Sequence, residues 1–131
     1  MKPAFLYVED DTLSREIMQL MMESLEHNLI TFEDSHDFMG RVEKLDPLPR
    51  VILLDIHVPP YDGFAMLEML RQNPAYKESR IIAVTASVMN EEIERLKRSG
   101  FDGAIGKPLD FEQFPMLLEQ LLHGDAVWHI S

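Results

Sequence analysis

The sequence contains no cysteine, and this absence excludes disulfide bonds and metal sites built on thiolates. Basic residues are scarce, because 12 Lys and Arg stand against 23 Asp and Glu and give a net charge of -11. An acidic surface of this kind repels a phosphate backbone, so we do not expect direct binding to nucleic acid. A chain without cysteine suits a reducing compartment, and the cytoplasm is the expected location.

Long apolar runs are missing as well. No stretch approaches the roughly 20 apolar residues that span a bilayer, and residues 1–8 lack the pattern of a secretory signal, so we expect no membrane insertion. Internal repeats are absent, and the 8 prolines are scattered rather than gathered into a linker. We therefore predict one domain over residues 1–124, followed by a short C-terminal tail at residues 125–131.

Short apolar segments alternate along the chain with longer amphipathic ones, as strands and helices do in an α/β protein. Three of the short segments are almost continuously apolar, which is typical of buried parallel strands. This alternation predicts a doubly wound, five-stranded parallel sheet, whose ligands bind beyond the carboxyl ends of the strands. The predicted strands are residues 4–8, 28–32, 51–54, 81–84 and 103–105.

Helices are predicted between these strands from capping residues and apolar spacing. In the first helix, Ile17, Leu20 and Met21 recur at helical spacing, and the Met residues at 18, 21 and 22 are interpreted as core filling. The predicted helices begin after Asp11 or Thr12, Asp34 or Ser35, Gly63, Asn90 and Asp110.

Five charged or reactive side chains occupy the positions where the predicted strands end. Glu9 and Asp10 follow the first strand, Asp55 ends the third, Thr85 ends the fourth, and Lys107 follows the fifth. Because parallel strands place their carboxyl ends along one edge of the sheet, these side chains are expected to converge there.

Three carboxylates that converge repel one another unless a cation is present. A site made of oxygen ligands favours a hard cation, so we predict Mg²⁺, with Mn²⁺ as the alternative. Asp55 would then act as a nucleophile toward phosphorus, while Lys107 offsets charge on the transferred phosphoryl group and Thr85 donates a hydrogen bond to it. Phosphoryl transfer depends mostly on positioning and electrostatics, so these residues are sufficient.

Each of these residues has a plainer interpretation when it is taken alone. The acids at 9–11 equally suit the solvated start of a helix, and Thr85 and Lys107 taken singly suit a strand-end hydroxyl and a surface lysine. Asp55 is harder to explain in this way, because a buried strand runs directly into it and an unpaired buried carboxylate is costly. Only the combination favours a phosphoryl-transfer site.

The motifs that carry these residues resemble those of the response-regulator receiver domains of two-component signalling, the CheY-like family. The resemblance covers about residues 2–122 and implies a flavodoxin-like (βα)₅ fold with strand order 2-1-3-4-5. Its matching segments are Val8-Glu9-Asp10-Asp11, the stretch from Asp55 to Gly63, Val84-Thr85-Ala86 and Lys107-Pro108.

The resemblance implies that Asp55 accepts a phosphoryl group from a phosphohistidine on a sensor histidine kinase or a phosphotransfer protein. Glu9, Asp10, Asp55 and the backbone carbonyl of His57 would hold the metal, and Thr85 would move toward the phosphoryl oxygens. Such a domain catalyses only its own phosphorylation and dephosphorylation. Its signal would reach a downstream protein, or a second receiver, through the fourth helix, the fifth strand and the fifth helix.

Ala104 departs from the family pattern, which places a switching Tyr or Phe three residues before the lysine. We therefore hypothesise that the shift of the Thr85 hydroxyl is reported by backbone movement at residues 87–90. Glu9 replaces the commoner Asp and lengthens the arm that would hold the metal. Few residues follow the fifth predicted helix, so a stand-alone receiver is expected, although a piece of a longer chain would look the same.

Three other classes of protein are weighed against this interpretation. An aspartate-nucleophile phosphatase would place a second acid two residues after the nucleophile, where this sequence has His57. A receiver-like module that only binds proteins would not need the complete set of acids, hydroxyl and lysine. A nucleotide-binding fold is disfavoured because acids, not glycines, follow the first strand.

Overall fold

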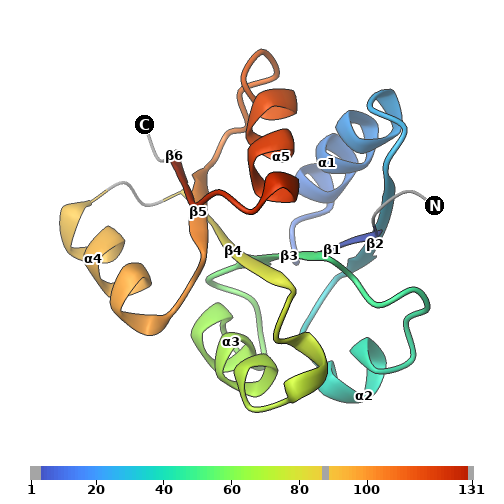
Figure 1. Ribbon diagram of the computed structural model, residues 1–131, viewed down its shortest axis with the longest axis vertical. Helices are drawn as coiled ribbons and strands as arrows, with labels where there is room; N and C mark the ends of the chain where they lie inside the picture. Colours follow the sequence, from blue (N-terminus) through green and yellow to red (C-terminus); the bar gives the residue numbers. More distant parts are fainter. Residues whose placement is uncertain (1–3, 87–88, 130–131) are drawn as a thin grey trace.

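The structure is a computed structural model that describes residues 4–86 and 89–129. Strands and helices alternate along the chain, and the helices cover both faces of a central sheet (Figure 1). The strands are β1 (Ala4–Val8), β2 (Asn28–Phe32), β3 (Val51–Asp55), β4 (Arg80–Thr85), β5 (Gly103–Gly106) and β6 (Val127–His129). The helices are α1 (Thr12–Ser24), α2 (Phe38–Val42), α3 (Gly63–Arg71), the 3₁₀ helix η1 (Pro74–Tyr76), α4 (Asn90–Ser99) and α5 (Phe114–His123).

The sheet has the order β2-β1-β3-β4-β5-β6, and the neighbouring strands in it are parallel. The predicted α/β class and the order 2-1-3-4-5 are confirmed. The sixth strand was not predicted: residues 127–129 of the expected tail pair with β5 and extend the sheet. The two halves of the strand order meet at β1 and β3, so the carboxyl ends of these two strands flank the position where such sheets bind ligands.

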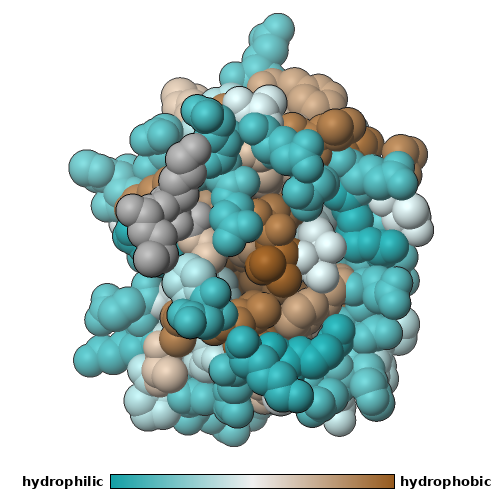
Figure 2. All heavy atoms as spheres, turned by 90° about the vertical axis from the view of Figure 1, so that its right-hand side faces the viewer, coloured by the Kyte–Doolittle hydropathy of each residue, from teal (hydrophilic) through white to brown (hydrophobic). Residues whose placement is uncertain are grey.

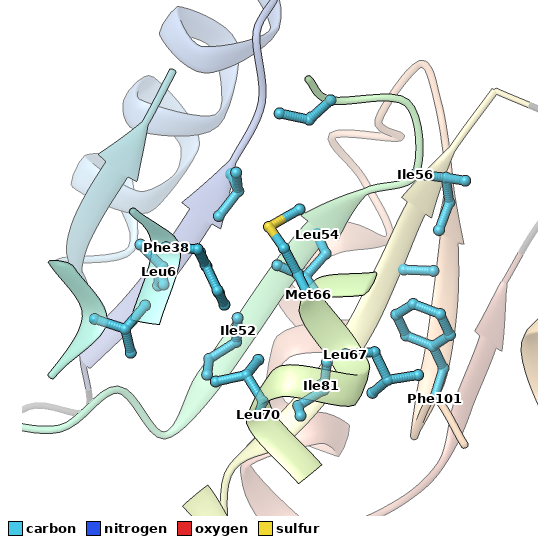
Figure 3. Packing of buried hydrophobic residues seen from close by; sticks show 14 of the residues in the cluster. Leu6, Phe38, Ile52, Leu54, Ile56, Met66, Leu67, Leu70, Ile81 and Phe101 are labelled. Carbon is cyan, nitrogen blue, oxygen red and sulfur yellow. The ribbon is translucent and has the colours of Figure 1, made fainter. Parts of the chain in front are cut away.

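The core consists of two apolar clusters, one on each face of the sheet. On one face, α3 packs on β3, and Figure 3 shows Met66 beside Leu54, Leu70 beside Ile52, and Leu67 near Ile81 and Phe101. On the other face, α1 and α5 cover side chains that alternate with those of the first cluster along the same strands. Because both faces are covered, β1 and β3 are buried along their whole length, which fixes the positions of the residues at their ends.

Helix α1 begins as predicted. The Asp11 side chain accepts a hydrogen bond from the Ser14 backbone N–H at 2.8 Å, which satisfies a donor that the first turn leaves free. The predicted core role of the methionines is confirmed, since Met18, Met21 and Met22 are buried. The assignment of Leu20 to the apolar face was wrong, because its side chain is 65% exposed.

The predicted start of the fifth helix after Asp110 was early. The Asp110 carboxylate accepts hydrogen bonds from the backbone N–H groups of Glu112 and Gln113, which closes a turn there, and α5 begins at Phe114. Pro115 lies in its first turn, where a missing N–H has no cost. An Asp side chain that bonds the backbone two residues on forms a turn as readily as a helix cap, and the sequence does not separate the two.

The two edges of the sheet differ. Strand β2 forms one edge, and Figure 2 shows the side of the molecule on which it lies, where an apolar patch is surrounded by a mostly hydrophilic surface. Strand β6 forms the other edge, beyond β5. In the part of the chain that the structure describes, no helix is long and apolar enough to cross a membrane.

Candidate metal and phosphoacceptor site

Three carboxylates meet at the carboxyl ends of β1 and β3. Glu9 and Asp10 follow β1, Asp55 is the last residue of β3, and one oxygen from each lies within 4.8 Å of the others. The Glu9 and Asp55 side chains are buried, whereas Asp10 is exposed at the mouth of the cluster. The sequence predicted this convergence, and the residues suit a hard divalent cation, which takes oxygen ligands.

Lys107, which directly follows β5, contacts two of these acids. Its Nζ donates a hydrogen bond to Glu9 Oε1 at 2.7 Å and lies 3.5 Å from Asp55 Oδ2. The backbone N–H of Lys107 donates to the Thr85 carbonyl at 2.9 Å, so the end of β4 and the residue after β5 are tied together. Thr85 is buried at the end of β4, where the sequence placed it.

The two buried carboxyl groups differ in acidity. Burial and then the neighbouring Glu9 raise the pKa of Asp55 to about 6, although Lys107 and the His57 N–H act in the opposite direction. Burial acts in the same direction on Glu9, but hydrogen bonds from Asp55, Lys107 and Tyr7 outweigh it and lower the pKa of Glu9 to about 2. Glu9 is therefore the ionised partner of the pair, and a cation bound beside Asp55 would favour ionisation of Asp55 as well.

The pKa of Lys107 shifts in the direction opposite to the one that its burial alone would give. Desolvation lowers the pKa of Lys107, but its hydrogen bond to Glu9 and the charge of Asp55 raise it by more, so the net direction is upward. Lys107 is thus a fixed positive charge across the usual pH range, directly beside the Asp55 oxygen. A charge placed there is suited to an anionic group that arrives at Asp55.

Tyr7 is a site residue that the sequence analysis missed. Its buried hydroxyl donates a hydrogen bond to Glu9 Oε1 at 2.9 Å, the same oxygen that Lys107 contacts. Burial and then the charge of Glu9 raise the Tyr7 pKa, so the hydroxyl stays protonated as a donor. Residues two apart on a strand share a face, so the spacing of Tyr7 and Glu9 was a usable signal.

Replacement of the Tyr7 hydroxyl tests whether this bond holds Glu9 in place. Tyr7→Phe leaves the ring and removes one of the two side-chain donors on Glu9 Oε1, and we expect a loss of about 2 kcal/mol in the free energy of unfolding at pH 7, as for a hydrogen bond to a charged group. Urea unfolding measures this loss. Tyr61→Phe is the matched control, because Tyr61 is 45% exposed, and an equal loss in both variants would contradict a special role for Tyr7.

The comparison with known families decides the class. The family model of the response regulator receiver domain matches residues 5–119 of this chain. The chain belongs to this receiver family. The resemblance drawn from the motifs is confirmed, and the receiver is a phosphoacceptor module of two-component signalling.

Several receivers are similar to this one. The probable C4-dicarboxylate response regulator DctR of Halalkalibacterium halodurans is 32% identical over 88% of this chain, which spans 49% of that protein. CheY4 of Vibrio cholerae has the same fold, with a TM-score of 0.83 and 21% identity over 92% of this chain and 99% of the other. The receiver domain of sensor histidine kinase PA1611 from Pseudomonas aeruginosa was solved with magnesium in its active site cleft. It gives a TM-score of 0.82 and 21% identity over 95% of this chain and 100% of the other.

The remaining predicted contributor to the receiver site is His57. Its backbone N–H donates to Asp55 Oδ1 at 3.3 Å, which helps to orient the Asp55 carboxylate, and its side chain is exposed. Beside the acids, a pocket of about 430 Å³ opens between α1 and the loop after β5. It is lined by Tyr7, Asp11, Leu13, Ser14, Ile17, Ala86, Lys107, Pro108 and Leu109.

Proposed function

We propose that this receiver accepts a phosphoryl group on Asp55 in a reaction that needs Mg²⁺, and that the modification controls the binding of a protein partner. One observation carries the proposal: Lys107 contacts both Glu9 and Asp55 at the point where three carboxylates meet. A purely structural cluster of acids would not need a buried nucleophilic carboxylate whose pKa is raised by its neighbours.

Glu9, Asp10, Asp55 and the backbone carbonyl of His57 would hold the cation. The bound ion would neutralise charge on the phosphoryl oxygens and on the attacking carboxylate. The magnesium in the cleft of the PA1611 receiver supports this choice of metal. Mn²⁺ is the alternative, because it also takes oxygen ligands.

The transfer itself forms one bond and breaks one bond. An Asp55 carboxylate oxygen attacks phosphorus, and the bond from phosphorus to the donor nitrogen breaks, so that the phosphohistidine imidazole leaves with the electron pair. Lys107 faces the Asp55 oxygen and offsets the charge that reaches it. Thr85, at the neighbouring strand end, would donate to a phosphoryl oxygen and so carry the change into α4.

Receiver domains partner with histidine kinases, and we propose a sensor histidine kinase or a histidine phosphotransfer protein as the donor. The pocket beside the acids lies on the accessible side of the site, and Leu13 on its rim is 63% exposed, which suits contact with the donor protein. We propose the surface of α4, β5 and α5 for the downstream protein or for pairing with a second receiver.

Incubation of the chain with acetyl phosphate tests the proposal directly. We expect intact mass to show the gain of a single phosphoryl group when Mg²⁺ is present and none when EDTA has removed it. The metal is needed because three carboxylates otherwise repel the incoming anion. If no gain forms with any divalent cation, the chain is instead a receiver-like module that binds proteins without phosphorylation.

A further inference from the structure

Strand β6 closes the edge of the sheet beside β5. Val127 is paired with Gly103 and is buried in the cluster under α1 and α5. A Cβ on Gly103 would collide with the Val127 backbone, so the close approach of the two strands requires glycine there. The edge of β5 is therefore shaped for a strand that lies directly against it.

Trp128 points to the opposite face from Val127, as neighbours on a strand do. It is paired with Ala104, a buried small residue on β5, and it packs partly buried against the cluster on the α3 side. The Lys97 Nζ of α4 lies 5.3 Å from the centre of its ring. Trp128 thus contacts both β5 and α4. Its aromatic ring lies beside Ala104, the position at which the family usually has a Tyr or Phe.

The attachment of β6 is slight. The strand has three residues and pairs on one side only, with β5. The chain before it is held by an exposed hydrogen bond, from Arg80 Nη2 to the Asp125 carbonyl at 3.0 Å. Although Val127 is buried, a short strand at the edge of a sheet opens at a smaller free energy than the strands at its centre.

Both elements that Trp128 touches lead to the receiver site. Strand β5 ends at Gly106, directly before Lys107, which contacts Glu9 and Asp55. Helix α4 begins five residues after Thr85. A phosphoryl group on Asp55 would add negative charge that competes with Glu9 for Lys107, so that a change at Asp55 would reach β5 and the short strand beside it.

We propose that β6 is a detachable cover: phosphorylation of Asp55 releases it and opens the edge of β5 to an extended peptide of a partner. This inference rests on the proposed function. The partner segment carries an aliphatic residue followed by an aromatic one, because Val127 and Trp128 fill the two faces beside this edge. Its backbone pairs with β5, as the backbone of β6 does.

Trp128 is the only tryptophan of the sequence, so its fluorescence reports the position of β6. With Mg²⁺ and acetyl phosphate, we expect acrylamide quenching of the full chain to rise roughly twofold, as for a local opening, and Asp55→Asn to show no rise. Intact mass is read on the same samples. A mass gain without a change in quenching overturns the cover, whereas the absence of a mass gain overturns the proposed function instead.

Two variants open the cover without phosphorylation. Gly103→Ala inserts a Cβ against the Val127 backbone, and Lys97→Gln removes the cation over Trp128, so each is expected to raise quenching before any donor is added. Lys77→Gln, at an exposed lysine directly after η1, is the control. A fluorescein-labelled peptide with the sequence Ala-Val-Trp-His should bind the phosphorylated chain more tightly than the resting chain, and equal binding to both forms contradicts the proposal.

Discussion

Asp55→Asn is expected to abolish phosphorylation of the receiver by acetyl phosphate and Mg²⁺. The amide has the size of the carboxylate but lacks its nucleophilic charged oxygen, and of the three clustered acids Asp55 is the one that Lys107 and the His57 N–H both face. The measurement is intact mass, followed by fragmentation to locate the modified residue. The unaltered chain should gain one phosphoryl group, and the variant none.

Asp46→Asn is the matched control, because Asp46 is exposed and lies outside the acid cluster. It should be phosphorylated like the unaltered chain. A phosphoryl group that persists in Asp55→Asn would show that a neighbouring acid, with Asp10 the nearest exposed one, is the true acceptor. That result would keep the metal site and reject the assignment of the nucleophile.

The convergence of the site was predictable from the sequence because it depends on topology alone. Once the strands are assigned, the residue at each strand end is placed along the carboxyl edge of a parallel sheet to within a few ångströms. Asp55, Thr85 and Lys107 follow from that rule, and the switch in strand order between β1 and β3 adds Glu9. Errors of one or two residues in a strand boundary do not move these side chains to another edge.

The parts that the sequence analysis missed depend on contacts between particular side chains. The spacing of Tyr7 and Glu9 places the two on one face of the strand, but it does not show that the Tyr7 hydroxyl donates to Glu9 Oε1 rather than packing in the core. Strand β6 is short, and its pairing with β5 depends on the absence of a side chain at Gly103. The hypothesis that residues 87–90 report the shift of the Thr85 hydroxyl rests partly on Ser87 and Val88, which lie outside the described residues.

The charges of the acid cluster work against the stability of the folded chain. Asp55 is buried beside ionised Glu9, and Lys107 offsets only part of the repulsion. In the folded state its pKa of about 6 lies above the ordinary 3.8, so the folded chain holds a proton there that the unfolded chain releases between these two values. Stability therefore falls as the pH rises from about 4 to 6, and the deficit persists above that range.

Asp55→Asn should consequently make the metal-free receiver more stable, by about 2 to 3 kcal/mol at pH 7, because the neutral amide removes the ionised carboxylate. The gain should shrink to near zero below about pH 3, where Asp55 is protonated in both the folded and the unfolded state. Urea unfolding across this range measures it, with Asp46→Asn expected to show no such change. Saturating Mg²⁺ should narrow or reverse the difference in the free energy of unfolding between the variant and the unaltered chain. The reason is that the ion binds the folded unaltered chain more tightly than the folded variant. If the variant is instead less stable than the unaltered chain at pH 7 in EDTA, Lys107 more than compensates the free-energy cost of burying the ionised Asp55. The acids and the lysine would then form an ion-pair network that is stable without a cation.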